Sequence, residues 1–279
     1  MMSSSSSSRI INVYSLDGSK VEQVELPRVF LTPYRMDLIH RAFVHIQSRS
    51  FQPQGRDPLA GMRVSAESRG TGLGIARMAR VKGEGMRRAG QAGGVAGVVK
   101  GRLTHPPRAE KVIVKRLNKK EKHLALCSAL AATAIREVVK ARGHRVPDDI
   151  ELPLIITDDI ESIGKSKDLL KVLNALRLSD DLKRASRSIK KRSGKARMRG
   201  RKQYIAKSIL VIVKNDNNSV ARAAGSIPGV EVVPVSRLSV IHLAPGGHPG
   251  RLCIWSKSAI ESIRNMSNDA VELMEVMTR

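Results

Sequence analysis

The sequence predicts an α/β protein: a three-layer body with a mainly parallel central sheet and a long extended basic loop. Short apolar runs alternate with helical patterns, which is typical of a parallel sheet covered on both faces. A hydrophobic content of 41% over 279 residues is enough for one core. We expect a disordered serine run at 1–8, one globular α/β domain from 9–47 and 109–279, an extended loop at 48–108, and a second basic segment at 183–207 inside the globular domain.

The first part of the body predicts a hairpin followed by a helix. Apolar residues alternate over 9–16 and 20–26, and Asp17 and Gly18 between them are a turn signal. Thr32 followed by a proline predicts a helix start. The apolar stripe at helical spacing is Met36, Ile39, Phe43 and Ile46.

The part after the loop predicts one long buried helix and then alternating strands and helices. Asn118 is the expected cap of a helix that runs to about Arg142 and is closed by Gly143. Its apolar residues occupy much of the circumference, so most of it should be buried. The predicted strands are 152–157, 209–214, 230–235 and 251–255. The predicted helices start at Ser166, at Ser179, near Val220 and after Ser256.

The formal net charge of +25 is concentrated in the two basic segments. Ten arginines and two lysines oppose three acids in 48–108, a net of +9, and 183–207 holds twelve basic residues and no acid. All other residues share +4. A locally concentrated excess of this kind marks a contact surface for nucleic acid or an anionic membrane.

The segment 48–108 lacks the side chains needed to order itself. It has twelve glycines, and Phe51 is its only aromatic residue. Ordering a backbone costs roughly 1 to 2 kcal/mol per residue, which so few large apolar groups cannot offset. A flexible linker or disordered insertion is one interpretation; the excess of arginine over lysine favours the other, a loop ordered by a polyanion.

The segment 193–202 has a cation at nearly every second position. In an extended backbone this spacing predicts one row of charges that could follow phosphates, whereas a solvated helix face normally carries compensating acids. Aromatic residues make up only 3% of the chain, so base stacking is not the expected main mode. Folded RNA contacted through phosphates, riboses and shape fits better than duplex DNA.

Catalytic motifs are incomplete. Gly164, Lys165 and Ser166 resemble the end of a phosphate-binding loop, but Asp159 stands where that motif needs a glycine. The histidines show no metal-ligand spacing. The sequence therefore predicts a protein that is not an enzyme, with no catalytic residues, no metal site and no cofactor.

Cysteine usage and hydropathy predict a cytoplasmic protein. Cys127 and Cys253 lie far apart and form no pairing motif, which favours a reducing compartment. No run reaches the ~18 apolar residues of a membrane span, and 1–8 lacks the apolar core of a signal peptide, so no membrane partner is expected.

Several motifs in order closely resemble the universal large-subunit ribosomal protein four family in its archaeal and eukaryotic cytosolic form. The matching stretches are 69–72, 76–81, 101–107, 124–133, 193–202 with Tyr204, 227–230, 243–248, 250–251 and 254–255. The resemblance covers 9–266, and the absence of a long C-terminal extension favours the archaeal form.

The resemblance implies a structural constituent of the large ribosomal subunit in the cytoplasm, with rRNA, neighbouring ribosomal proteins and the nascent polypeptide as partners. It implies that the loop threads through rRNA to the wall and constriction of the peptide exit tunnel, with its tip around 72–82. The implied tunnel-facing residues are Arg77, Met78 and Arg80. The implied rRNA clamps in the loop are Arg63, Arg69, Arg87, Arg88, Lys100, Arg102 and Arg108. The implied second anchor consists of Lys195, Arg197, Arg199, Arg201 and Lys202. A free-standing RNA-binding regulatory protein using the same surfaces is the alternative.

Overall fold

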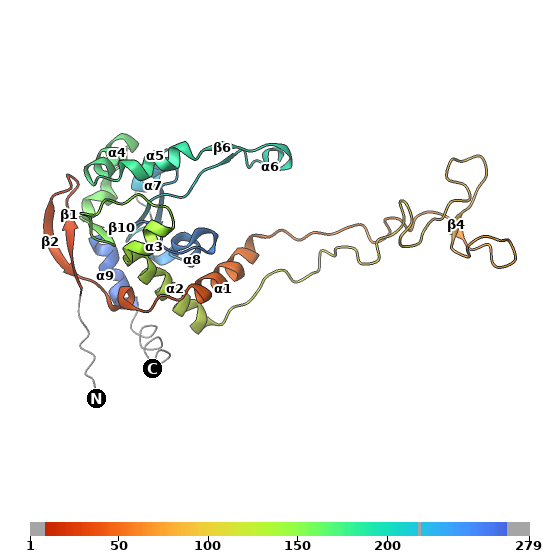
Figure 1. Ribbon diagram of the computed structural model, residues 1–279, viewed down its shortest axis with the longest axis horizontal. Helices are drawn as coiled ribbons and strands as arrows, with labels where there is room; N and C mark the ends of the chain where they lie inside the picture. Colours follow the sequence, from red (N-terminus) through yellow and green to blue (C-terminus); the bar gives the residue numbers. More distant parts are fainter. Residues whose placement is uncertain (1–8, 217–218, 267–279) are drawn as a thin grey trace, which may run out of the picture. The chain divides into compact units, whose positions relative to one another are not determined.

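The computed structural model describes residues 9–216 and 219–266, so the serine run at 1–8 lies outside the described residues. The chain separates into two compact units (Figure 1). The first, here called the body, comprises Met1–Gln47 and Arg116–Arg279; the second, the loop unit, is Ser48–Lys115.

The body is built on a six-stranded sheet with the strand order β2-β1-β5-β10-β8-β9. Only the pair β1 and β2 is antiparallel; the other neighbours are parallel. Ile254 in the centre pairs with Leu154 on one side and Val211 on the other. The bounds are Ile10–Tyr14 (β1), Lys20–Glu25 (β2), Leu154–Ile156 (β5), Leu210–Val213 (β8), Glu231–Pro234 (β9) and Cys253–Ser256 (β10). The predicted α/β fold with a mainly parallel sheet is confirmed.

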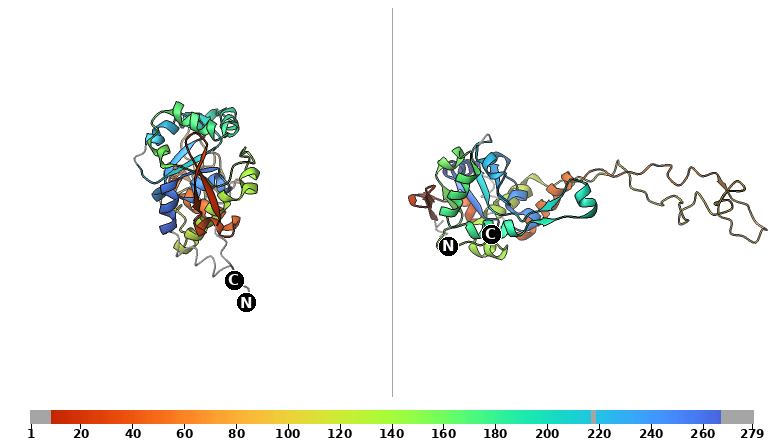
Figure 2. Two further views of the ribbon diagram at one scale, coloured as in Figure 1. Left: turned by 90° about the vertical axis from the view of Figure 1, so that its left-hand side faces the viewer. Right: turned by 90° about the horizontal axis from the view of Figure 1, so that it is seen from above.

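Helices cover both faces of this sheet, which gives three layers (Figure 2). On one face lie α1 (Met36–Gln47), α2 (Lys119–Ala134), α8 (Val240–Leu243) and α9 (Lys257–Met266). On the other lie α3 (Arg136–Ala141), α4 (Ser166–Ala175), α5 (Ser179–Arg187) and α7 (Ser219–Ala224). Short 3-10 turns occur at Arg28–Leu31 (η1), Ser48–Ser50 (η2), Asp158–Ser162 (η3), Val235–Arg237 (η4) and Pro245–Gly247 (η5).

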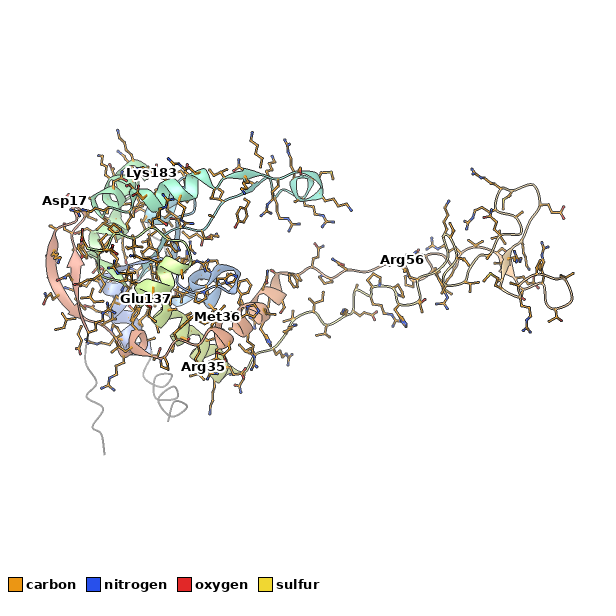
Figure 3. The ribbon with its side chains drawn as sticks, in the orientation of Figure 1. Asp17, Arg35, Met36, Arg56, Glu137 and Lys183 are labelled. Atoms are coloured by element: carbon orange, nitrogen blue, oxygen red, sulfur yellow. The ribbon has the colours of Figure 1, made fainter. Side chains whose placement is uncertain are left out.

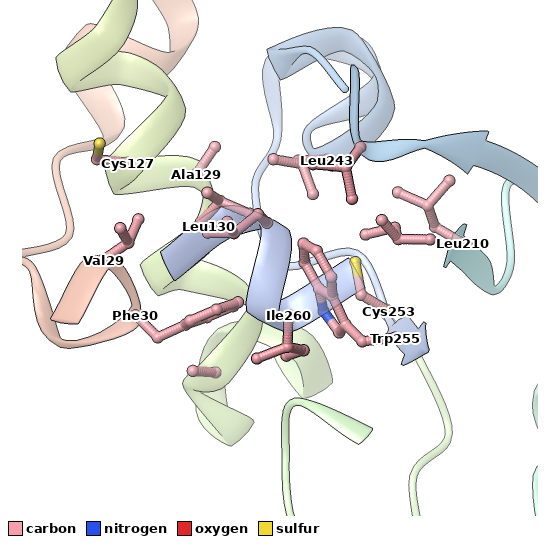
Figure 4. Packing of buried hydrophobic residues seen from close by; sticks show 14 of the residues in the cluster. Val29, Phe30, Cys127, Ala129, Leu130, Leu210, Leu243, Cys253, Trp255 and Ile260 are labelled. Carbon is pink, nitrogen blue, oxygen red and sulfur yellow. The ribbon is translucent and has the colours of Figure 1, made fainter. Parts of the chain in front are cut away.

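Strands β5 and β8 are apolar throughout, and β10 is apolar up to Ser256, because neither face of the central sheet meets water. Successive side chains of a strand point to opposite faces, so Trp255 packs in one core and Ile254 in the other. Trp255 is fully buried and meets the ring of Phe30 edge-on, with centroids 5.5 Å apart and an angle of 84° between the rings (Figure 4). None of the described helices is long and apolar enough to cross a bilayer.

The helix predicted to start at Thr32 begins instead at Met36. The hydroxyl of Thr32 donates to the carbonyl of Val29, 2.7 Å away, and so closes the preceding 3-10 turn. The predicted apolar stripe is confirmed in part: Ile39 is fully buried and Ile46 packs against the core, whereas Met36 is 48% exposed. Leu38, outside the predicted stripe, is also buried. Packing against α2 selects the face that points inward.

The long helix predicted from Asn118 to Arg142 is two helices separated at Ile135, whose backbone is extended with φ −92° and ψ 109°. The predicted cap is confirmed, since the side chain of Asn118 accepts from the amide of Lys120 at 3.1 Å. Ala134 packs in the core on one side of the sheet and Val139 in the core on the other. One straight helix could not serve both layers, so the chain turns between them.

Candidate nucleic-acid interface

The basic segment 183–207, here called the arm, is a narrow projection of the body. It contains a two-stranded antiparallel ladder, β6 (Lys190–Lys191) with β7 (Gln203–Tyr204), and a five-residue helix, α6 (Gly194–Met198), at its end. The amide of Arg192 donates to the carbonyl of Lys202 at 2.9 Å and extends the ladder toward the helix. Neither strand joins the six-stranded sheet.

The expectation of an extended backbone through 193–202 is wrong at its centre. Alanine, lysine, arginine and methionine are good helix formers, and α6 consists of them after its first glycine. Gly200 ends the helix at φ +79°, while the amide of Arg201 donates to the carbonyl of Ala196 at 3.0 Å. The cations therefore project in several directions from a helical turn and do not form one straight row.

The predicted cations of the arm are all exposed. They are Lys195, Arg197, Arg199, Arg201 and Lys202. Figure 3 shows side chains that extend from the end of the arm on several sides. None of the five cations takes part in an ion pair with a carboxylate in the described part of the chain. Below them the guanidinium of Arg192 lies 5.6 Å from the ring centre of Tyr204, a cation–π contact.

Side-chain hydrogen bonds hold the two ends of the arm together. The hydroxyl of Ser188 accepts from the amide of Ala206 at 2.9 Å, which links the outgoing and returning chains. Arg184 of α5 donates to the carbonyl of Lys207 at 3.1 Å. Both contacts close the arm at its base.

Asp181 is the buried carboxylate on which this base rests. It accepts from Nε of Arg184 at 2.9 Å, from the amide of Arg145 at 3.1 Å, and from the hydroxyl of Ser208. The Nδ1 of His144 lies 3.2 Å from both carboxylate oxygens. Burial alone raises the pKa of Asp181, but these hydrogen bonds hold that pKa well below its usual range. Burial lowers the pKa of His144 and outweighs the attraction of Asp181.

Arg251 is a fully buried arginine beside this cluster. Its Nε donates to the carbonyl of Ser208 at 2.9 Å, and its Nη1 donates to Glu231 at 2.6 Å. Burial lowers the pKa of Arg251 to about 10. Arg251 lies within one of the family motifs, but its role could not be predicted, because a lone arginine beside an apolar strand gives no sign of its buried partners.

The loop unit runs out and returns with its two chains side by side. At its ends the hydroxyl of Ser48 accepts from the amide of Lys115 at 3.0 Å. Farther along, the amide of Arg56 donates to the carbonyl of Pro107 at 3.2 Å. Gly61, with φ +81°, leaves no room for a side chain, because a Cβ there would lie 2.5 Å from the carbonyl oxygen of Gly101.

The far part of the loop unit has more internal order than its composition suggests. β3 (Ala66–Glu67) pairs antiparallel with β4 (Arg80–Val81). Val81 is 5% exposed, and its amide donates to the carbonyl of Gln91 at 2.9 Å. The expectation of a wholly structureless segment is therefore too strict, since paired backbone supplies local order where large apolar side chains are missing.

The predicted clamps of the loop differ in whether they already form contacts within the loop unit. Arg63 pairs with Asp57 at 2.7 Å, and Arg88 donates to the carbonyl of Val99 at 3.4 Å. Lys100 has φ +59°, an uncommon backbone conformation for a residue with a side chain. The exposed predicted clamps are Arg63, Arg69, Arg87, Lys100, Arg102 and Arg108.

The three predicted tip residues also differ. Arg77 and Met78 are exposed, Met78 by 40%. Arg80 turns inward: it is half-buried and its Nη1 donates to the carbonyl of Gly90 at 3.0 Å. Its Nε is buried without a hydrogen-bond partner among the described residues.

The residues at and just before the incomplete phosphate-loop motif have structural roles. Lys165 is extended and precedes α4. A carboxylate oxygen of Glu161 accepts from the amide of Lys214 at 2.9 Å and from the hydroxyl of Ser256 at 2.8 Å. No group of three potential metal ligands occurs among residues 9–216 and 219–266.

The fold and these surfaces define a basic α/β protein with its excess of exposed cations concentrated in two segments. The chain belongs to the ribosomal protein L4/L1 family, whose model matches residues 24–266. This confirms the resemblance and the prediction that the protein is not an enzyme, because members of a ribosomal protein family are structural components of a translation particle.

Relatives of this chain include proteins named large ribosomal subunit protein uL4. The protein of Sulfolobus acidocaldarius is 48% identical over 254 residues, which cover 91% of this chain and 93% of that protein. The protein of Sulfurisphaera tokodaii is 47% identical over 253 residues, with the same coverage. The protein of Saccharolobus islandicus is 46% identical over 245 residues, covering 88% of this chain and 90% of that protein.

Proposed function

We propose that this chain is a structural component of the large ribosomal subunit in the cytoplasm and that it binds rRNA through the loop unit and the arm. The observation that carries the proposal is the excess of exposed cations over acids in both segments, a net of +9 in 48–108 and twelve basic residues with no acid in 183–207. Membership of a ribosomal protein family and relatives named for the large subunit support it.

The binding mechanism is phosphate neutralisation with release of counterions, to which arginine adds bidentate geometry. The proposed clamps in the loop are Arg63, Arg69, Arg87, Arg88, Lys100, Arg102 and Arg108. The second anchor is Lys195, Arg197, Arg199, Arg201 and Lys202. Gly70, Gly72 and Gly74 have positive φ and open space around the Cα, which lets RNA approach the backbone closely.

The loop helps to form the wall and constriction of the peptide exit tunnel, where Arg77, Met78 and Arg80 face the nascent polypeptide. Arg77 and Met78 are exposed and able to do so directly. Arg80 holds the backbone near Gly90 and so shapes the same surface. Neighbouring ribosomal proteins are the remaining partners.

Sedimentation tests the ribosomal assignment. A tagged copy of the full chain should remain with large subunits after a salt wash that leaves core proteins bound, and should be absent from the soluble fraction. Release of the chain under that wash would contradict a structural role.

Site-directed cross-linking tests the tunnel assignment. Both native cysteines are buried, and burial raises the pKa of Cys127 to about 11 and that of Cys253 to about 12, so a thiol introduced on the surface would react selectively. Met78→Cys carrying a thiol-linked photo-cross-linker should capture a stalled radiolabelled nascent chain. Met198→Cys on the arm is the control, and equal capture by both variants would exclude a special place for the tip.

A further inference from the structure

The body contains a concave pocket of about 940 Å³ at the base of the arm. Its walls come from the region where α1 begins, the end of α3, helix α5, both chains of the arm, and the turn at 245–249. Four cations line it: Arg142, Arg184, Arg192 and Lys207. No acidic residue does.

The charges around this pocket do not balance among the described residues. Asp181 pairs with Arg184, while Lys207 and Arg251 share the single carboxylate of Glu231. Arg142 has hydrogen bonds only to carbonyl groups, among them that of Pro245 at 2.9 Å. Two carboxylates, Asp181 and Glu231, thus oppose four cations, which are Arg142, Arg184, Lys207 and Arg251. Arg192 in the pocket wall is a fifth cation.

Arg142 carries the cost of this imbalance. Burial, and to a lesser extent the charges of Arg251 and Arg184, lower its pKa to about 10. A cation held among other cations is stabilised by an anion that enters from solvent. The pocket is therefore suited to a phosphate group.

The pocket also offers a flat surface. Tyr204, 52% exposed, lies in the pocket wall with Arg192 against its ring, and Tyr34 is a second aromatic group in the lining. Tyrosine and arginine planes are the surfaces on which unpaired bases stack. Binding of a small anion such as free phosphate would make no use of these planar side chains.

Resting on the proposed rRNA-binding function, we propose that this pocket receives a single unpaired nucleotide of RNA, its base stacked on Tyr204 and its phosphate near Arg142 and Arg192. The volume lies in the range of small-ligand pockets and admits one nucleotide. A regular duplex keeps its bases stacked inside and can present only phosphates. An acidic peptide supplies charge without a broad planar group.

The test uses the purified full chain and two fluorescein-labelled RNA duplexes of the same sequence, one of them carrying a single bulged adenosine. Fluorescence anisotropy at fixed salt gives the affinity for each. The wild-type protein should prefer the bulged duplex. Tyr204→Ala should reduce this preference roughly tenfold or more, while Tyr204→Phe should retain most of it.

A matched charge control separates the pocket from the rest of the arm. Arg199→Ala removes a cation outside the pocket and should weaken both duplexes equally, whereas Arg192→Ala should weaken the bulged duplex more. Unchanged Trp255 fluorescence would show that each variant keeps its body folded.

Two results would overturn the proposal: no preference of the wild-type protein for the bulged duplex, or an equal loss for both duplexes in Tyr204→Ala. The proposal would also be contradicted if an oligo-aspartate displaced the bulged duplex as effectively as unlabelled bulged RNA does. That result would mean that the pocket binds anions without recognising a base. These outcomes are independent of the sedimentation test, because the chain can be a large-subunit component with this pocket empty.

Discussion

The arm is fixed to the body by a buried carboxylate, whereas the loop unit holds its own chain together with backbone hydrogen bonds and exposed ion pairs. Asp181 at the base of the arm has a fully buried side chain. In the loop unit Arg63 and Asp57 form an ion pair whose side chains are 69% and 43% exposed. Exposed pairs contribute little, and buried ones are costly to break.

The comparison shows that a high density of positive charge does not determine whether a segment is ordered by the rest of the protein. Both segments carry a large excess of arginine and lysine, so either can bind a polyanion. The base of the arm is ordered by contacts within the protein, while the loop unit has one large buried side chain, Val81, and we expect it to gain most of its order on binding RNA. Four predictions test this contrast, from the largest expected effect to the smallest.

The largest effect is expected for Asp181→Ala. It leaves Arg184 and its neighbours without their carboxylate, and removing one partner of a buried pair costs roughly 3–5 kcal/mol. Urea unfolding followed by Trp255 fluorescence measures this loss. Asp180→Ala is the control, because that side chain is 65% exposed and pairs with Lys183 at the surface. Equal losses in the two variants would mean that the arm has no buried anchor.

The second prediction compares one valine in each region. Val211→Ala in β8 should cost roughly 2 kcal/mol, since it removes two methyl groups from a fully buried site. Val81→Ala should leave the same Trp255 transition unchanged, because Trp255 lies in the body and is the only tryptophan. A shift of that transition by Val81→Ala would contradict the separate folding of the two units.

The regular parts of this fold were predictable because their signals are local. The apolar runs around Ile212 and Trp255 predicted strands, and Ser166 predicted the start of α4. The break at Ile135 was not predictable, because it arises when the chain crosses from one face of the sheet to the other and the neighbouring residues favour a helix. Helix α6 was missed because charge spacing was weighed without helix propensity.

The candidate interface divides in the same way. Exposed cations follow from composition, so the exposure of Arg197 and Arg69 could be predicted from the sequence alone, while their contact with rRNA stays a prediction. The sequence does not distinguish Asp180 from Asp181, although one is at the surface and the other is buried under the arm. Tertiary neighbours decide which of two adjacent carboxylates becomes the anchor.

The third prediction concerns pH, because only the anchor of the arm contains a buried histidine. Burial lowers the pKa of His144, so the unfolded chain binds the proton more readily than the folded chain does. Its neutral form therefore contributes stability fully above the unfolded pKa near 6.5, and this contribution is lost as the pH falls through that value. The wild-type protein should lose stability relative to His144→Gln between pH 7.5 and 5, by no more than about 1.4 kcal/mol per pH unit. A parallel pH dependence of the two proteins would show that His144 does not titrate in this range.

The smallest effect is expected for single surface cations. For these residues the arm and the loop unit should behave alike. Counterion release depends on the number of phosphates neutralised and not on whether the backbone was ordered beforehand. Arg197→Ala in the arm and Arg69→Ala in the loop unit should therefore each reduce the slope of log affinity against log salt by about 0.7 to 0.9 for an rRNA fragment that engages both regions. Titrations at several salt concentrations measure it, with Lys171→Ala on α4 as the control that should leave the slope unchanged. If Arg197→Ala lowers the slope and Arg69→Ala does not, the loop unit fails to engage RNA in the isolated protein, and its order then depends on the assembled particle and not on RNA charge alone.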